Sequence, residues 1–166
     1  MKNIALIQWV NELSHELKGN ILPFWLKYAR DTESGGFYGN LNNNNAGDAR
    51  CPRSVVMVSR HLWTYSAAAR FLKEPMLLAG ADYAYAYLCK NFFDKRRGGV
   101  YWTVAQDGKP VDSRKQIYGE AFAVYGLSEF ASAVAEFRSK DAAETILDAA
   151  LAIFDLLETH ARDHQL

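Results

Sequence analysis

A short glycine motif occurs twice in the chain, and this repeat constrains the fold more than any other feature of the sequence. Residues 35–38, Gly-Gly-Phe-Tyr, reappear 63 positions later as Gly-Gly-Val-Tyr at 98–101. Each copy follows a segment with one apolar helical face and precedes a segment that is apolar on most faces. A repeat of this length is typical of architectures in which each unit buries its apolar face against its neighbours. The repeat therefore predicts an all-α fold of helix hairpins, an α/α toroid, with short strands in the inter-helix loops.

The hydrophobic pattern predicts helices separated by the glycine loops and by polar turns. They span about residues 4–28, 52–71, 75–91, 113–136 and 139–160. The second and fourth are apolar on nearly every face, so we expect them to be the inner, most buried helices, with the others outside. Pro23 is expected to kink or restart the first helix. Pro52 and Pro75 are expected in the first turn of the second and third helices, where a missing N–H costs nothing.

A toroid needs several such units, because each unit buries its apolar face only against the next one. The 166 residues hold two complete units and one further helix. We therefore expect residues 1–166 to form a single domain that is the N-terminal part of a longer toroid, with the C-terminal remainder missing. Apolar surfaces left open in this way favour association, so a homo-oligomer formed through them is one expected state.

Composition argues against several classes of partner. Hydrophobic residues make up 49% of the chain, which is enough for a core, and nineteen basic side chains balance nineteen acidic ones. The longest run of Lys and Arg, at residues 95–97, is too short for an anion-binding site, so neither nucleic acid nor an anionic membrane is expected as a partner. Cys51, Cys89 and the histidines show no metal-ligand spacing, so we expect no metal or other cofactor. No signal peptide or bilayer-spanning stretch is visible, and a cytoplasmic protein with reduced thiols is expected.

Arg60 and His61 lie in the middle of the second predicted helix, which is apolar on nearly every face. A buried guanidinium needs an anion, which is either a partner side chain or a ligand, and the residues alone favour a structural ion pair. His61 is adjacent and so points to another face, where we expect a solvated or hydrogen-bonded structural histidine rather than a catalytic base. Trp63 and Trp102 are candidates to stack on a ligand ring, although such tryptophans are more often core residues.

Four segments carry a family resemblance. They are Leu-Pro-Phe-Trp-Leu-Lys-Tyr at 22–28, Gly-Gly-Phe-Tyr-Gly at 35–39, Ser-Arg-His-Leu-Trp-Thr-Tyr-Ser at 59–66 and Lys-Gln-Ile-Tyr-Gly-Glu-Ala-Phe-Ala at 115–123. In this order they resemble the N-acylglucosamine 2-epimerase family, and within it the cellobiose (mannobiose) 2-epimerases. The resemblance implies an (α/α)6 barrel with a sugar pocket at one end of the inner helices, of which this chain covers less than half.

The resemblance also implies an activity and a site. Such enzymes epimerise C2 of a reducing-end mono- or disaccharide through an enediolate, or interconvert aldose and ketose, without a cofactor. Arg60 matches an arginine that hydrogen-bonds the sugar oxygens carrying the enediolate charge, and Tyr118 matches a tyrosine that contacts the same ring. With Trp63 these are the expected substrate-binding residues, and Arg60 is the expected catalytic one. The resemblance implies no role for His61 or Glu120. The family's two catalytic histidines would lie beyond Leu166, so this chain alone is expected to have little or no activity.

Two other classes of function remain open at this point. A glycoside hydrolase can share the toroid and works through a pair of carboxylates. Asp48, Asp112 and Glu120 lie near the starts of the expected inner helices, although the sequence singles out no pair among them. The other alternative is a non-catalytic chain, either truncated or a module that assembles with a second chain.

Overall fold

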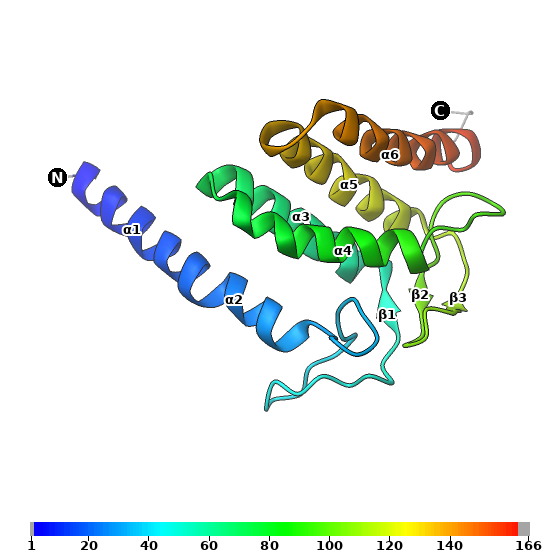
Figure 1. Ribbon diagram of the computed structural model, residues 1–166, viewed down its shortest axis with the longest axis horizontal. Coiled ribbons are helices and arrows are strands. Elements are labelled where there is room, and N and C mark those ends of the chain that lie inside the picture. The colour runs from blue at the N-terminus through cyan, green and yellow to red at the C-terminus, as the bar shows by residue number, and fades with distance from the viewer. Residues whose placement is uncertain (1, 163–166) are drawn as a thin grey trace.

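The structure, a computed structural model, describes residues 2–162 and consists mainly of helices, with three short strands gathered at one end (Figure 1). A long N-terminal helical segment comprises α1 (Lys2–Glu16) and α2 (Leu22–Phe24), each followed by a π-helical turn, Leu17–Ile21 and Trp25–Ala29 respectively. The other helices are α3 (Val55–Leu72), α4 (Leu78–Asn91), α5 (Ile117–Phe137) and α6 (Lys140–His160), with a single 3-10 turn at Pro75–Leu77. The expected mainly helical class with short inter-helix strands is confirmed.

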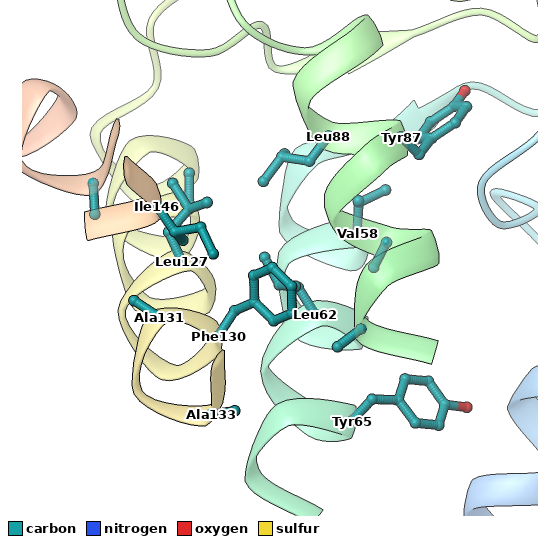
Figure 2. Close-up of a cluster of buried hydrophobic side chains, with 14 of the residues drawn as sticks. Val58, Leu62, Tyr65, Tyr87, Leu88, Leu127, Phe130, Ala131, Ala133 and Ile146 are labelled. Carbon is teal, nitrogen blue, oxygen red and sulfur yellow. The ribbon is translucent and has the colours of Figure 1, made fainter. Parts of the chain in front are cut away.

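Helices α3 and α5 form the centre of the packing. They lie against each other, while α4 packs on α3 and α6 packs on α5. Figure 2 shows the shared core, in which Leu62 from α3, Leu88 from α4 and Phe130 from α5 point toward one another. Neither central helix is buried all round, however, because Arg60 and Tyr118 are exposed. They nevertheless hold more buried residues than α4 or α6, in line with the expectation that they are the most buried helices, and no described element covers their exposed side.

The N-terminal helical segment passes through Pro23 without a break. Pro23 lies in the first turn of α2, and the residues on either side of α2 adopt π-helical turns. A proline removes one N–H donor and crowds the preceding turn. The wider π-helical turns accommodate the lost hydrogen bond and the crowding. The expected restart of the helix at Pro23 is not observed, and Figure 1 shows one extended helical path.

Strand pairing sets where α3 and α5 begin. Strand β1 (Arg53–Ser54) pairs antiparallel with β2 (Thr103–Val104), which pairs in turn with β3 (Pro110–Asp112). These pairings keep the chain extended just before each helix, so α3 and α5 begin later than the positions 52 and 113 that the sequence predicted. The side chain of Ser54 then caps α3 by accepting a hydrogen bond from the backbone N–H of Met57 at 3.1 Å.

The two glycine loops adopt the same backbone turn. In the first, the N–H of Asp31 donates to the carbonyl of Gly36 at 2.9 Å, and in the second the N–H of Asp94 donates to that of Gly99 at the same distance. Both glycines of each pair have positive φ, between 67° and 83°, as expected for residues that must adopt the left-handed region. The first loop forms isolated bridges rather than one of the short strands that the sequence predicted for the inter-helix loops.

A buried ion pair joins the first glycine loop to the start of α3. The guanidinium of Arg53 donates to Asp31 Oδ2, and their side chains are 0% and 1% exposed. Asp31 Oδ1 accepts the backbone N–H groups of the loop, and the hydroxyl of Tyr83 donates to the Asp31 carbonyl at 2.5 Å. The argument that a buried guanidinium needs an anion thus applies to Arg53, which the sequence pattern did not single out.

Two outer helices expose apolar side chains. On α1, five large hydrophobic residues are at least half exposed, and on α6 three more are between 41% and 48% exposed. They are Leu6, Ile7, Trp9, Val10 and Leu13 on α1, and Leu147, Leu151 and Phe154 on α6. Among the described residues, no helix combines the length and the apolar character that crossing a bilayer requires.

Replacing Asp31 with Asn should destabilise the chain strongly. The amide oxygen can still accept the loop N–H groups, but the buried Arg53 loses its counter-charge, which costs about 3–5 kcal/mol of unfolding free energy. Urea unfolding of the variant and the wild type measures the difference. Asp107→Asn is the matched control, because Asp107 has the same kind of backbone acceptor role and an exposed partner, Lys109. Unfolding of that variant should be nearly unchanged. Equal small effects from both substitutions would contradict the assigned role of the buried pair.

Candidate active site

A groove of about 640 Å³ opens between α3 and α5. Its lining comes from one face of each helix and is largely aromatic: Arg60, Trp63, Thr64, Tyr118, Ala121, Phe122 and Tyr125. Arg60 is the charged residue of this lining. The structure thus brings together the three residues that the sequence singled out for substrate binding, Arg60, Trp63 and Tyr118.

Aromatic contacts connect several residues that line the groove. The rings of Trp63 and Tyr125 stack across the two helices with centroids 5.0 Å apart and an interplanar angle of 13°. Along α5, Tyr118 contacts Phe122 edge-on at 4.8 Å. The helices approach closely here because Gly126 has no side chain, and a Cβ at that position would lie 2.8 Å from the backbone oxygen of Ser59. The groove is therefore held by packing between α3 and α5.

Arg60 is exposed and lines this groove, and within residues 2–162 it forms no ion pair. Among residues 2–162, the arginines in ion pairs are others: Arg50, Arg53, Arg70, Arg114, Arg138 and Arg162. The structural ion pair that the residues alone favoured for Arg60 is therefore not formed within the described chain. A planar guanidinium with its donors available can bind the oxygens of a ligand that carries or develops negative charge.

His61 lies beside a second cavity, of about 400 Å³, which Arg60 also lines. The imidazole stacks on the ring of Phe37 with centroids 3.8 Å apart and meets Trp25 edge-on at 5.7 Å. Burial, followed by the nearby charge of Arg60, lowers the pKa of His61 to about 4. Aromatic stacking covers part of the ring and the rest stays accessible, so the ring is neutral near pH 7 and belongs to a partly buried structural histidine rather than a catalytic base.

The carboxylates considered for a hydrolase pair do not meet at the groove. Asp48 and Asp112 each pair with the arginine two positions later, at 3.5 Å and 2.5 Å. Glu120 is buried, and both its oxygens accept the backbone N–H of Val100, at 3.0 and 3.1 Å. None of the three lines the groove, and Trp102 does not line it either, since its ring lies against the start of α5 near Gly119.

Sequence reasoning missed the rest of the groove wall. Phe122 and Tyr125 lie four and seven positions after Tyr118, so they share its helix face, and this spacing was a visible signal. Thr64 follows Arg60 by four positions on α3 in the same way. Within the part of the chain that the structure describes, no three His, Cys, Asp or Glu side chains come together as a metal site would require.

Comparison with known proteins identifies the family. The sequence model of the N-acylglucosamine 2-epimerase (GlcNAc 2-epimerase) family matches residues 24–166. The chain belongs to the N-acylglucosamine 2-epimerase family. A cellobiose 2-epimerase of Bacteroides fragilis is 38% identical over 152 residues, which are 92% of this chain and 37% of that protein.

Solved structures of N-acylglucosamine 2-epimerase relatives show the same helical arrangement. Cellobiose 2-epimerase from Spirochaeta thermophila matches with a TM-score of 0.86 at 37% identity, covering 97% of this chain and 38% of that one. The enzyme from Bacillus thermoamylovorans matches with a TM-score of 0.85 at 35% identity, covering 95% and 39%. The helices thus match part of an (α/α)6 barrel, and the expected fold class is confirmed. The chain spans less than two fifths of the length of these relatives.

The stability of the chain should depend on pH through His61. The pKa of this side chain is about 4 when folded and about 6.5 when unfolded, so below pH 6.5 the unfolded chain takes up a proton that the folded chain does not. Stability should therefore fall by about 2 kcal/mol as the pH drops from 6.5 toward 4. His61→Phe keeps a ring on Phe37 and should remove this component. Urea unfolding at pH 7 and pH 4.5 measures it.

His160→Gln is the control for that experiment, because His160 is exposed on α6. Its loss should leave the pH dependence as in the wild type. If His61→Phe and His160→Gln behaved alike, burial of a neutral imidazole at position 61 would be ruled out.

Proposed function

We propose that this chain is the N-terminal part of a carbohydrate 2-epimerase that acts at C2 of a reducing-end sugar through an enediolate. The observation that carries the proposal is the unpaired guanidinium of Arg60 in an aromatic groove, in a chain of the N-acylglucosamine 2-epimerase family. Several relatives bear the name cellobiose 2-epimerase, which makes a mono- or disaccharide with a free reducing end the expected substrate.

The proposed chemistry fits the groove. Removal of the C2 proton from the open-chain sugar leaves negative charge on oxygen, and a fixed guanidinium stabilises that charge as it develops. We assign this role to Arg60. The flat faces of Trp63 and Tyr118 would pack on the C–H face of the sugar ring, and the hydroxyl of Tyr118 would bond to a sugar oxygen. The residues act by binding and orienting the sugar and by stabilising the enediolate.

The proton transfers need other groups. After ring opening, epimerisation removes the C2 proton and returns one to the opposite face, and each transfer works best through a group whose pKa is near the working pH. The family resemblance assigns both transfers to histidines that this chain lacks. His61, with a pKa of about 4 and a ring stacked on Phe37, is poorly suited to replace them. We therefore propose that the chain alone has little or no activity.

The exposed apolar faces of α1 and α6 support the same assignment. We propose that residues 1–166 form one domain of an incomplete (α/α)6 barrel, and that further helices cover both faces in the complete enzyme. Without those helices, copies of the chain would associate through the same faces as a homo-oligomer.

Cys51 and Cys89 are free thiols, which is consistent with a cytoplasmic location.

The chain alone should not exchange the C2 proton of a sugar. Incubation with cellobiose in deuterated water tests this, because removal and return of the proton at C2 introduces deuterium there. Deuterium at C2 at an enzymatic rate would show that the chain holds its own base and would overturn the proposed inactivity. The light-scattering mass of the same sample, compared with 18.7 kDa for a monomer, shows whether copies associate under the conditions of the assay.

In the barrel completed by the remaining units, Arg60→Ala should lower turnover by on the order of 100- to 1000-fold, as loss of one donor to a developing oxyanion does. Arg60→Lys should rescue little, because an ammonium cannot reproduce the planar two-pronged contact. Turnover and melting temperature are measured on the same samples.

Arg70→Ala is the matched control for Arg60→Ala. Arg70 lies on the same helix but pairs with Glu129 and Glu136, so its loss should affect melting and leave turnover per folded molecule intact. An Arg60→Ala enzyme that is destabilised yet fully active would exclude the catalytic role.

A further inference from the structure

The first turn of α5, which carries Tyr118, lacks the cap that its neighbours have. Ser54 caps α3 and Ser139 caps α6, each by accepting a backbone N–H with its side chain. The N-cap residue of α5, Gln116, makes no such bond. The first backbone N–H groups of a helix have no partner inside it, so an uncapped first turn frays unless something else holds it. Tyr118 itself is 62% exposed, and its own burial therefore does little to hold it.

An ion pair links this turn to the second glycine loop. Lys115, just before α5, lies with Nζ 3.2 Å from Asp94 Oδ2 and 4.9 Å from the centre of the Tyr101 ring. Asp94 is fixed in turn, because its other oxygen accepts the backbone N–H groups of Arg96 and Arg97 at 3.0 and 3.1 Å. Desolvation alone would raise the pKa of Asp94, but these bonds and Lys115 lower it to about 2. The carboxylate is therefore charged at any ordinary working pH.

A second contact holds the other side of the same turn. Glu120 is 1% exposed, and its carboxylate accepts the backbone N–H of Val100 in the glycine loop. Gly99 makes room for it, since a Cβ there would lie 2.5 Å from Glu120 Oε1. A buried carboxylate is costly unless its bonds are made, so this contact favours one position of the first turn.

We propose that Lys115 and Glu120 are positioning residues that clamp the first turn of α5 to the second glycine loop and so hold Tyr118 at the groove. They lie three residues before and two residues after Tyr118, and both anchor to the segment 94–100. The first unit holds α3 with the related pair of Asp31 and Arg53, but there Ser54 also caps the helix. The clamp rests on the proposed function in one respect, that Tyr118 is the sugar contact it serves.

The test uses the 166-residue chain labelled with 3-fluorotyrosine. Tyr118→Phe identifies the Tyr118 fluorine resonance among the nine tyrosines. In Lys115→Met and in Glu120→Ala, that resonance should move toward its position in the unfolded chain as the contact with Phe122 is lost. Amide exchange of Glu120, Ala121 and Phe122 should become faster by about tenfold or more, as expected for loss of a charged contact at a helix end. Exchange in α6 should not change.

Conservative variants separate positioning from general stability. Lys115→Arg and Glu120→Gln keep a donor and an acceptor in place, and each should restore the Tyr118 resonance and the slow exchange. Lys109→Met is the matched control, because it removes an exposed Lys–Asp pair in the β2–β3 turn without touching α5. If Lys115→Met changed exchange equally along the whole chain, or left the Tyr118 resonance in place, the clamp would be overturned.

Titration with cellobiose separates failure of the clamp from failure of the proposed function. In the first outcome, the variants change the Tyr118 resonance as described, but the wild-type resonance does not shift on addition of cellobiose. That result would support the clamp and exclude Tyr118 as a sugar contact. A wild-type Tyr118 resonance that shifts with cellobiose, and does so equally in Lys115→Met and Glu120→Ala, would keep the sugar contact and overturn the clamp.

Discussion

The buried ion pair between Asp31 and Arg53 is the contact on which the rest of the arrangement depends. It joins the loop that ends the first helical segment to the strand that leads into α3, and both side chains are almost fully buried. Two guanidinium nitrogens of Arg53, Nε and Nη1, have no protein hydrogen-bond partner, so the pair carries a large desolvation cost. The pair instead restricts the conformation, because the two charges can pair only when the loop and the strand lie side by side. The second unit has a similar ion pair between Lys115 and Asp94, in which the lysine side chain is more exposed than that of Arg53.

These anchors explain how a groove forms between two helices that belong to different units. Strand β1 leads directly into α3, and β3 lies shortly before α5, so both helices begin beside the same small sheet (Figure 1). Arg60 and Tyr118 therefore line one groove although they are far apart in the sequence. The opposite faces of the two helices hold the core with α4 and α6. A closely packed side and an open, largely aromatic side that carries Arg60 suit a binding site, because packing on one side of the helices positions the residues on the other.

The sequence by itself determined the pattern of helices and loops, the repeated unit and the positive φ of its glycines. Local physics decides these features, since helical periodicity and glycine conformations involve residues close in sequence. The segments around Arg60 and Tyr118 were also enough to indicate the family, which the match to its sequence model confirms. Phe122 and Tyr125 could also have been predicted to line the groove, because their spacing from Tyr118 places them on the same helix face.

Only the tertiary structure decided which arginine is buried. A helix that is apolar on most faces does not reveal which face its neighbours cover, and here the covered side includes Leu62 while Arg60 stays open. Arg53 is buried because Asp31, 22 residues earlier, folds back onto it. The late starts of α3 and α5 likewise depend on pairing of β2 with β1 and β3, and the low pKa of His61 depends on a ring from the first glycine loop. Each of these outcomes is a contact between distant segments, which periodicity along one segment cannot specify.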